Sequence, residues 1–97
     1  MTCHVIFETT VKDGNLDGLR KWFTEKLPGT RGFAGNVSVE VVHNQDDPSK
    51  ILFLEKWDSR QSFERYLAWR VETGAVDELG TMLDGEIDFR YYDALGV

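Results

Sequence analysis

Cysteine and histidine are scarce in this chain of 97 residues, which contains one cysteine and two histidines. Cys3 alone forms neither an intrachain disulfide nor a cysteine-based metal site. His4 and His43 lie on different predicted strands, and neither belongs to a His-x-x-x-His pattern of the kind that binds zinc. We therefore expect no metal and no disulfide framework.

Long hydrophobic runs and excess positive charge are also missing. The apolar run Ile51–Leu54 is too short to cross a membrane, and the N-terminus lacks the basic start of a signal peptide. Seventeen Asp and Glu against 11 Lys and Arg give a net charge of −6. Nucleic acids and anionic membranes both attract cationic surfaces. We expect a cytoplasmic protein that binds neither nucleic acid nor membrane.

Two common enzyme signatures are absent as well. No serine has a Gly-x-Ser-x-Gly setting, and Gly32 and Gly35 form no dinucleotide fingerprint, which argues against a hydrolase of that type and a Rossmann domain. The composition is 41% hydrophobic and 12% aromatic, as in globular proteins. The length predicts one domain over residues 1–97.

Alternating and helical periodicities divide the chain into seven elements. Four segments alternate as strands do: Cys3–Val11, Asn36–His43 with Val37, Val39 and Val41 on one face, Ile51–Trp57, and Glu86–Tyr92. Three segments have helical spacing. The first covers residues 16–27, and Pro28-Gly29 should end it. The second should begin after its N-cap, Asp58, and end at Gly74, and a short third helix should cover residues 75–83.

The order predicts an α+β, ferredoxin-like βαββαβ fold with an antiparallel sheet and an extra short helix before the last strand. The helices would cover one sheet face and leave the other bare. Each strand nevertheless carries apolar side chains on both faces. We therefore expect a homodimer, a dimeric α/β barrel with the bare faces together. The alternative is a monomer whose polar residues, such as Glu8 and Glu40, face water.

Two motifs resemble a known family. They are Leu27-Pro28-Gly29-Thr30-Arg31 and Glu55-Lys56-Trp57-Asp58-Ser59, the latter followed by Phe63 and Tyr66-Leu67. The chain resembles the antibiotic biosynthesis monooxygenase family over nearly its whole length. The resemblance implies a dimer that oxidises quinol-like or polycyclic aromatic compounds with O₂ and without flavin, haem or metal.

The sequence also departs from that family. Tyr66 stands where many quinol-oxidising relatives carry His. The haem-degrading branch has an axial His about ten residues beyond that position, where this chain reads Gly74-Ala75-Val76-Asp77. None of these residues ligates haem iron. We therefore do not expect haem degradation or a bound cofactor.

Three residues are the predicted catalytic groups: Tyr66, Trp57 and Arg70. On a helical wheel Phe63, Leu67 and Val71 form the apolar face of the second helix, and Arg70 falls on the same inward side. A guanidinium there needs an acceptor, either Glu55 or a substrate oxyanion, unless it extends to water. The Tyr66 hydroxyl and the Trp57 indole N–H are donors that could serve a substrate or simply complete the core.

The predicted substrate-binding residues are aromatic: Phe7, Phe23, Phe53, Phe63 and Trp69. By default such phenylalanines form the core, but some should line a pocket between sheet and helices. Trp22 and Trp69 could wall a groove or lie at a dimer boundary. His43, at a strand end, is a weaker candidate base or a solvated edge residue.

These residues lead to two main hypotheses. The first is a cofactor-independent monooxygenase that acts on a small electron-rich aromatic molecule and O₂. The second is a non-catalytic dimeric domain that binds a small hydrophobic molecule in the same cavity. An isomerase is a weaker third possibility, since a fold does not determine chemistry.

Overall fold

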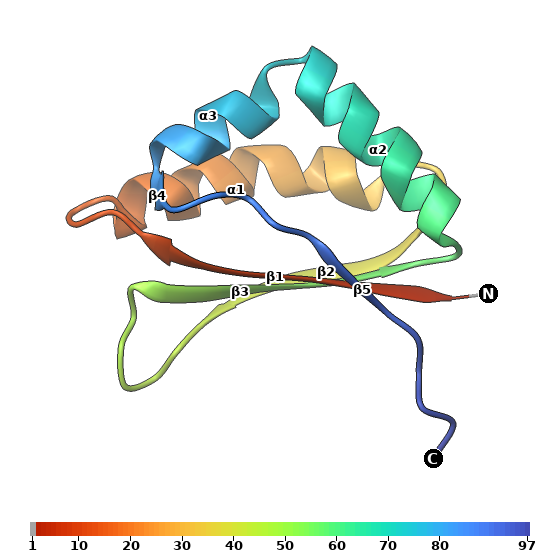
Figure 1. Ribbon diagram of the computed structural model, residues 1–97. Helices are drawn as coiled ribbons and strands as arrows, with labels where there is room; N and C mark the ends of the chain where they lie inside the picture. The colour runs from red at the N-terminus through yellow and green to blue at the C-terminus, as the bar shows by residue number, and fades with distance from the viewer. Residues whose placement is uncertain (1) are drawn as a thin grey trace.

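Three helices lie on one side of an antiparallel sheet in the computed structural model, which describes residues 2–97 (Figure 1). The elements are β1 (Cys3–Val11), α1 (Leu16–Arg31), β2 (Asn36–His43), β3 (Lys50–Trp57), α2 (Arg60–Glu72), α3 (Ala75–Thr81), β4 (Leu83–Asp84) and β5 (Arg90–Tyr92). This order confirms the predicted α+β, ferredoxin-like fold with an extra short helix.

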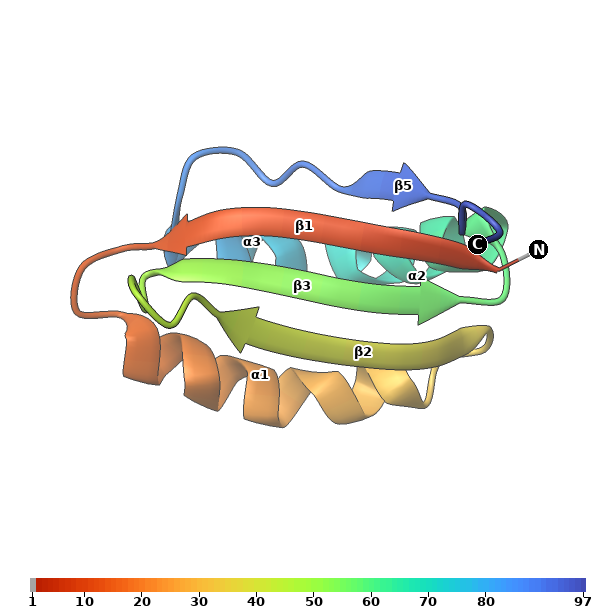
Figure 2. The same ribbon diagram turned by 90° about the horizontal axis from the view of Figure 1, so that it is seen from below.

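The sheet has the order β2-β3-β1, with β4 and β5 both paired to the other edge of β1 (Figure 2). All pairs are antiparallel, and β2 and β3 form the expected hairpin. A register shift interrupts that pairing between Asn36 and Ser38. Val37 lies at this bulge and is 57% exposed, so its predicted place on the face of Val39 and Val41 was wrong.

The last strand is shorter than predicted. Instead of a continuous strand over Glu86–Tyr92, two short segments pair with β1, one before and one after residues 85–89. Gly85 adopts a φ of +89°, which glycine tolerates and which turns the chain after β4. Phe89 still points inward, with its ring centroid 5.1 Å from that of Phe7. The alternation therefore predicted correctly that Phe89 faces the core, but not where the backbone pairs with β1.

Helix α1 continues past the predicted stop at Pro28 and ends at Arg31. Proline removes one helical N–H, which costs stability but does not end a helix when tertiary contacts hold the next turn. Here the guanidinium of Arg70 on α2 donates to the Lys26 carbonyl at 2.7 Å and to the Thr30 hydroxyl at 3.2 Å. The last turn of α1 is thus fastened to α2.

Helix α2 begins one residue later than predicted. Ser59, not Asp58, is the N-cap, and its hydroxyl accepts from the Ser62 N–H at 3.1 Å. Gly74 follows the helix with a φ of +82°, as expected for its end. Val71 is 57% exposed, so the predicted apolar face was wrong at that position.

The core lies between the sheet and the helices. The ring of Phe53 meets those of Phe7 and Phe23 edge-to-face, with centroids 4.8 Å apart in each pair. Trp57 and Phe63 are fully buried nearby. Within residues 2–97 no helix or strand covers the opposite sheet face (Figure 1). None of the helices in residues 2–97 has the length and hydrophobicity needed to span a membrane.

Candidate active site

A small cavity of about 50 Å³ lies between the helices and the sheet. It combines aromatic walls with three groups able to donate or accept protons: Glu55, Tyr66 and Arg70. Its other lining residues are Trp22, Phe23, Lys26, Leu27, Thr30, Val39, Phe53, Leu67, Ala75, Val76, Leu79 and Phe89. Strands β2 and β3 form one side of the cavity and all three helices contribute to the other.

Arg70 is the charged centre of this cavity. Its side chain is buried, with 8% exposure, so the predicted alternative in which it extends to water is wrong. Nε donates to the Tyr66 hydroxyl at 2.9 Å, and Nη2 donates to the Lys26 carbonyl and the Thr30 hydroxyl. Within residues 2–97 no hydrogen bond from Nη1 is found, so this nitrogen remains available to a bound molecule.

Tyr66 and Thr30 complete the polar cluster. Their hydroxyl oxygens are 2.6 Å apart, and either one can be the donor. Arg70 donates to both oxygens, so one hydroxyl proton must serve the contact between them. If Thr30 donates, the Tyr66 proton is free to bond a ligand. The cluster therefore offers both a cation and an adjustable hydroxyl donor.

Glu55 is the buried acid of the site. It is 7% exposed and accepts a hydrogen bond from the Trp57 indole at 3.2 Å. Burial raises the pKa of Glu55 to about 7, while the Trp57 hydrogen bond and the positive charge of Arg70 act in the opposite direction. Arg70 acts at a distance, because among the described residues no ion pair joins it to Glu55. Near neutral pH this carboxyl can accept or release a proton.

Residues 2–79 match the family described as antibiotic biosynthesis monooxygenase. The match spans most of the chain and includes every polar residue of the cavity. The chain belongs to the antibiotic biosynthesis monooxygenase family.

Solved structures agree with this assignment at the level of the fold. A conserved protein from Methanosarcina mazei Go1 has a TM-score of 0.86 at 17% identity, covering 95% of this chain and 91% of its own. An antibiotic biosynthesis monooxygenase has a TM-score of 0.84 at 20% identity, with coverages of 96% and 98%. A variant of SnoaB, a cofactor-independent oxygenase from Streptomyces nogalater, has a TM-score of 0.85 at 14% identity, with coverages of 99% and 95%.

The predicted site residues separate into those that line the cavity and those behind it. Tyr66, Arg70, Phe23 and Phe53 line it. The others do not: Trp57, Phe7 and Phe63 are buried in the core, and Trp69 stacks on Phe33 with centroids 5.4 Å apart. The Trp57 N–H is already bonded to Glu55, so in this arrangement it orients the carboxyl.

Two polar residues of the site, Glu55 and Thr30, are not among the predicted site residues. Strand alternation places Glu55 on the buried face with Phe53 and Trp57, but the sequence indicates it only as an acceptor for Arg70. Thr30 follows Pro28-Gly29, the predicted end of the helix, so the sequence does not place its hydroxyl near Tyr66. Only the extension of α1 turns this hydroxyl toward Tyr66.

Two contacts of Glu78 join α1 and α3 beside the cavity. The Trp22 indole N–H on α1 donates to Glu78 Oε1 on α3 at 2.9 Å, and the Lys26 ammonium lies 3.8 Å from the same oxygen. Trp22 and Lys26 line the cavity, and so do Ala75, Val76 and Leu79 of α3. We call these two contacts the Glu78 latch. It holds α3 against α1 beside the site.

Proposed function

We propose that this protein is a cofactor-independent monooxygenase that oxidises a small quinol-like or polycyclic aromatic compound with O₂. Membership of the monooxygenase family supports the general type of reaction. The observation that carries the proposal is one cavity with a carboxyl of pKa about 7, a phenol hydroxyl and a guanidinium. These groups match the needs of an oxidation that begins with deprotonation of the substrate.

The proposed reaction starts with transfer of a proton from an acidic O–H or C–H of the substrate to Glu55. The resulting anion is a stronger reductant than the neutral compound and gives one electron to O₂. Arg70 Nη1 and the Tyr66 hydroxyl would stabilise the negative charge, first on the substrate oxygen and then on the reduced oxygen. Substrate electrons thus replace those of a cofactor.

For a ring methylene, recombination forms a carbon–oxygen bond and a peroxide. The peroxide takes up a proton and loses water to leave a carbonyl. The net change is CH₂ plus O₂ to C=O plus H₂O, which balances atoms and electrons. Glu55 can return its proton to the departing oxygen, so the site finishes in its starting state.

The cavity must open for this chemistry. Small-molecule sites have volumes of roughly 300 Å³ or more, whereas this cavity holds about 50 Å³. Displacing α3, which carries three of the lining residues, would enlarge it. Within residues 2–97 the Glu78 latch is the polar contact found between α3 and α1, and the buried Leu79 adds apolar packing to it. Reclosure would exclude water from the charged intermediates.

Oxygen uptake after mixing anaerobic substrate with aerated protein tests the proposal. Across a panel of quinols and anthrone-like rings, at least one should be consumed above its spontaneous rate. Glu55→Gln should lower kcat by about 100-fold or more, as expected for loss of a general base. Glu64→Gln, an exposed carboxyl on α2, is the matched control and should retain full activity.

The alternative is a non-catalytic domain that binds a small hydrophobic molecule. One observation favours binding without catalysis: a larger groove, of about 450 Å³, also borders Phe23, and neither Glu55 nor Arg70 lines it. The ligand would then lie in this groove and not in the cavity expected from the sequence. Tight binding of the panel compounds with no oxygen uptake would support this alternative and exclude the monooxygenase.

A further inference from the structure

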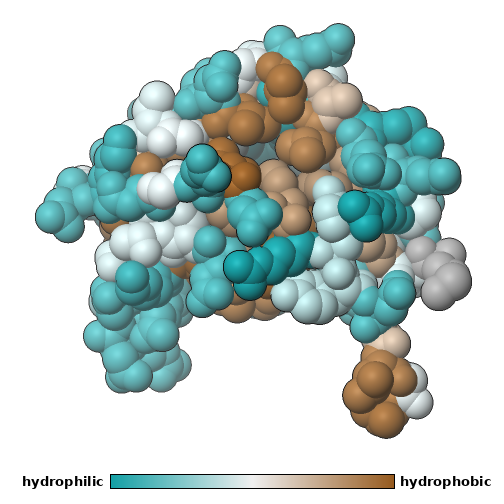
Figure 3. All heavy atoms as spheres, viewed as in Figure 1, coloured by the Kyte–Doolittle hydropathy of each residue, from teal (hydrophilic) through white to brown (hydrophobic). Residues whose placement is uncertain are grey.

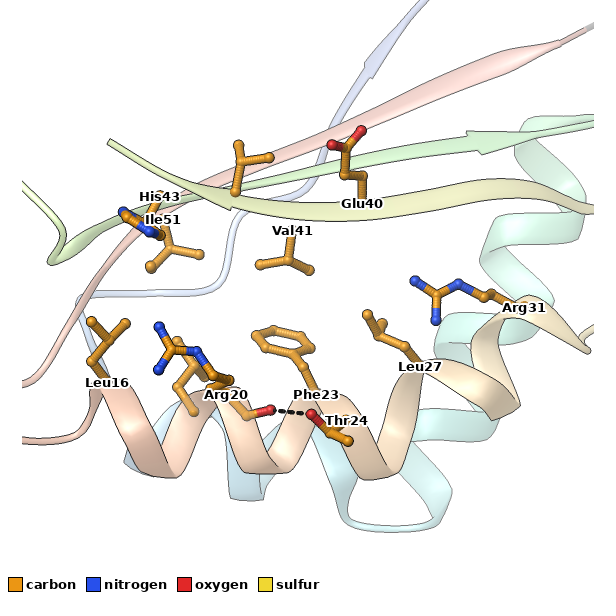
Figure 4. Close-up of a pocket in the computed structure, with 12 residues that line it drawn as sticks. Leu16, Arg20, Phe23, Thr24, Leu27, Arg31, Glu40, Val41, His43 and Ile51 are labelled. Atoms are coloured by element: carbon orange, nitrogen blue, oxygen red, sulfur yellow. Dashed lines mark hydrogen bonds between the residues drawn. The ribbon is translucent and has the colours of Figure 1, made fainter. Parts of the chain in front are cut away.

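A groove of about 450 Å³ lies between α1 and β2, apart from the cavity of Glu55, Tyr66 and Arg70 (Figure 4). Its volume falls within the range of roughly 300–1,000 Å³ found for small-molecule sites. Strand β2 is the last strand on its side of the sheet, so the groove is not closed by a further strand. We call the cavity of Glu55, Tyr66 and Arg70 the reaction cavity. Phe23 and Leu27 are the lining residues that the groove shares with it.

The floor of the groove is apolar. Phe23 on α1 and Val41 on β2 face one another across it, with Leu27 beside them (Figure 4). Leu16, Leu19 and Ile51 extend the same surface toward the start of the helix. A hydrocarbon chain lying along α1 would therefore contact apolar side chains over several turns.

Positive charge lies above this floor, in a protein whose net charge is −6. The side chains of Arg20 and Arg31 reach from α1 into the space below β2, whereas Glu40, the acidic lining residue, points away from it (Figure 4). Arg20 is partly neutralised by Asp17 at 3.2 Å. Arg31 makes a long hydrogen bond, 3.4 Å, to the Val39 carbonyl. Within residues 2–97 no ion pair of Arg31 is found, so its charge is less neutralised than that of Arg20.

We propose that this groove binds an apolar monocarboxylate, such as a medium-chain fatty acid. The carboxylate lies on the Arg31 guanidinium, whose planar fork matches two carboxylate oxygens. The hydrocarbon chain covers Leu27, Phe23 and Val41. The proposal does not depend on the oxidation reaction, because none of its polar contacts involves Glu55, Tyr66 or Arg70.

An added peptide strand fits this edge less well than a small molecule. Strand addition uses the backbone of an edge strand, but Arg31 already donates to the Val39 carbonyl. The register shift between Asn36 and Ser38 also distorts β2 near the same end. Both features protect the edge against another chain while leaving the guanidinium exposed to a carboxylate.

Calorimetric titration tests the site, with octanoate and decanoate below their micelle concentrations and decanol below its solubility limit. Decanoate should bind about 15-fold more tightly than octanoate, since each buried methylene contributes about fourfold. Arg31→Gln should weaken decanoate binding at least tenfold and leave decanol unchanged. Lys21→Gln removes an exposed charge of α1 outside the groove and should change decanoate affinity less than twofold.

Amide chemical shifts on decanoate addition should change along α1 and β2. Equal affinity for decanol and decanoate, or equal effects of the Arg31 and Lys21 substitutions, would overturn the proposal. Shifts centred on Glu55 and Tyr66 would also overturn it, by placing the ligand in the reaction cavity. So would a wild-type oligomer that buries the groove and fails to bind decanoate, because the groove would then be an interface between copies.

Discussion

Glu55 is the residue whose ionisation should be visible in the stability of the protein. Because its folded pKa is about 7 and its ordinary value is 4.5, the folded state holds a proton between these values that the unfolded state has released. Stability must therefore fall as pH rises through this window. The change attributable to Glu55 between pH 5 and pH 8 should be about 2–3 kcal/mol.

Glu55→Gln removes this titration. Urea unfolding of both proteins at pH 5 and pH 8 should show that the variant gains stability relative to wild type at the higher pH. Parallel pH dependences of the two unfolding free energies would contradict the raised pKa.

Tyr66 can be tested by removing one oxygen atom. In Tyr66→Phe, the Arg70 Nε and the Thr30 hydroxyl lose a partner, so we expect a loss of about 1–3 kcal/mol in unfolding free energy. If the hydroxyl also stabilises the oxyanion, kcat should fall roughly 10- to 100-fold at constant substrate affinity. Tyr92→Phe, an exposed tyrosine, is the control. An unchanged kcat in Tyr66→Phe would restrict Tyr66 to a structural role.

Sequence periodicity was sufficient to place Tyr66 and Arg70 on the inward side of one helix. It was not sufficient to choose the acceptors of Arg70 on α1, because the Lys26 carbonyl and the Thr30 hydroxyl lie on either side of Pro28 and meet Arg70 only when α1 continues past it. It also did not reveal that Trp57 and Glu55 bond to one another, since hydrogen bonding between residues i and i+2 of a strand depends on side-chain conformations. Such contacts depend on tertiary structure.

At the scale of elements, the polar contacts between α3 and α1 can be removed while the core packing of Leu79 is kept. Glu78→Ala eliminates both interactions of the Glu78 latch. Because Glu78 is exposed, we expect its loss to cost less than about 1 kcal/mol. Hydrogen exchange of the α3 amides should become faster, and substrate association should accelerate several-fold.

Asp77→Ala is the matched control for this change. Asp77 also lies in the first turn of α3, so its removal alters the interaction with the helix dipole in the same way. Equal acceleration in both variants would mean that helix stability, not the contact with Trp22, controls access.

The bounds of a strand were predicted well where side-chain alternation continued along the whole strand. Alternation located β1 at its exact ends, because β1 lies in the middle of the sheet and buries one face throughout. The last strand was predicted as one segment over Glu86–Tyr92, but only its end, β5, pairs with β1. The other short strand, β4, lies before the predicted segment. Side-chain alternation reports which face is buried, and it does not report whether the backbone has a neighbour.

At the scale of the whole molecule, the bare sheet face supports the predicted homodimer. Ile6 and Leu54 are opposite one another on β1 and β3. Their neighbours along each strand are buried beneath the helices, so by alternation Ile6 and Leu54 belong to the other face of the sheet. Sedimentation velocity should give a dimer for the wild type. Leu54→Glu should shift it toward monomer, because two carboxylates would be buried between the sheets.

Gln61→Glu adds the same charge at an exposed position on α2 and should leave the dimer intact. A wild-type protein that stays monomeric at tens of micromolar would contradict the predicted assembly.

The C-terminal end, which projects from the body of the molecule, is a second exposed apolar surface. It carries the exposed residues Leu95 and Val97 (Figure 3).

The small volume of the reaction cavity has a consequence for the speed of turnover. If each catalytic cycle requires α3 to move away from the cavity and return, the helix must displace solvent in both movements. The turnover rate would then depend on friction with the solvent, as expected when conformational steps limit an enzyme. Adding sucrose should slow turnover in proportion to viscosity, whereas Glu78→Ala, with its weaker closure, should be less sensitive.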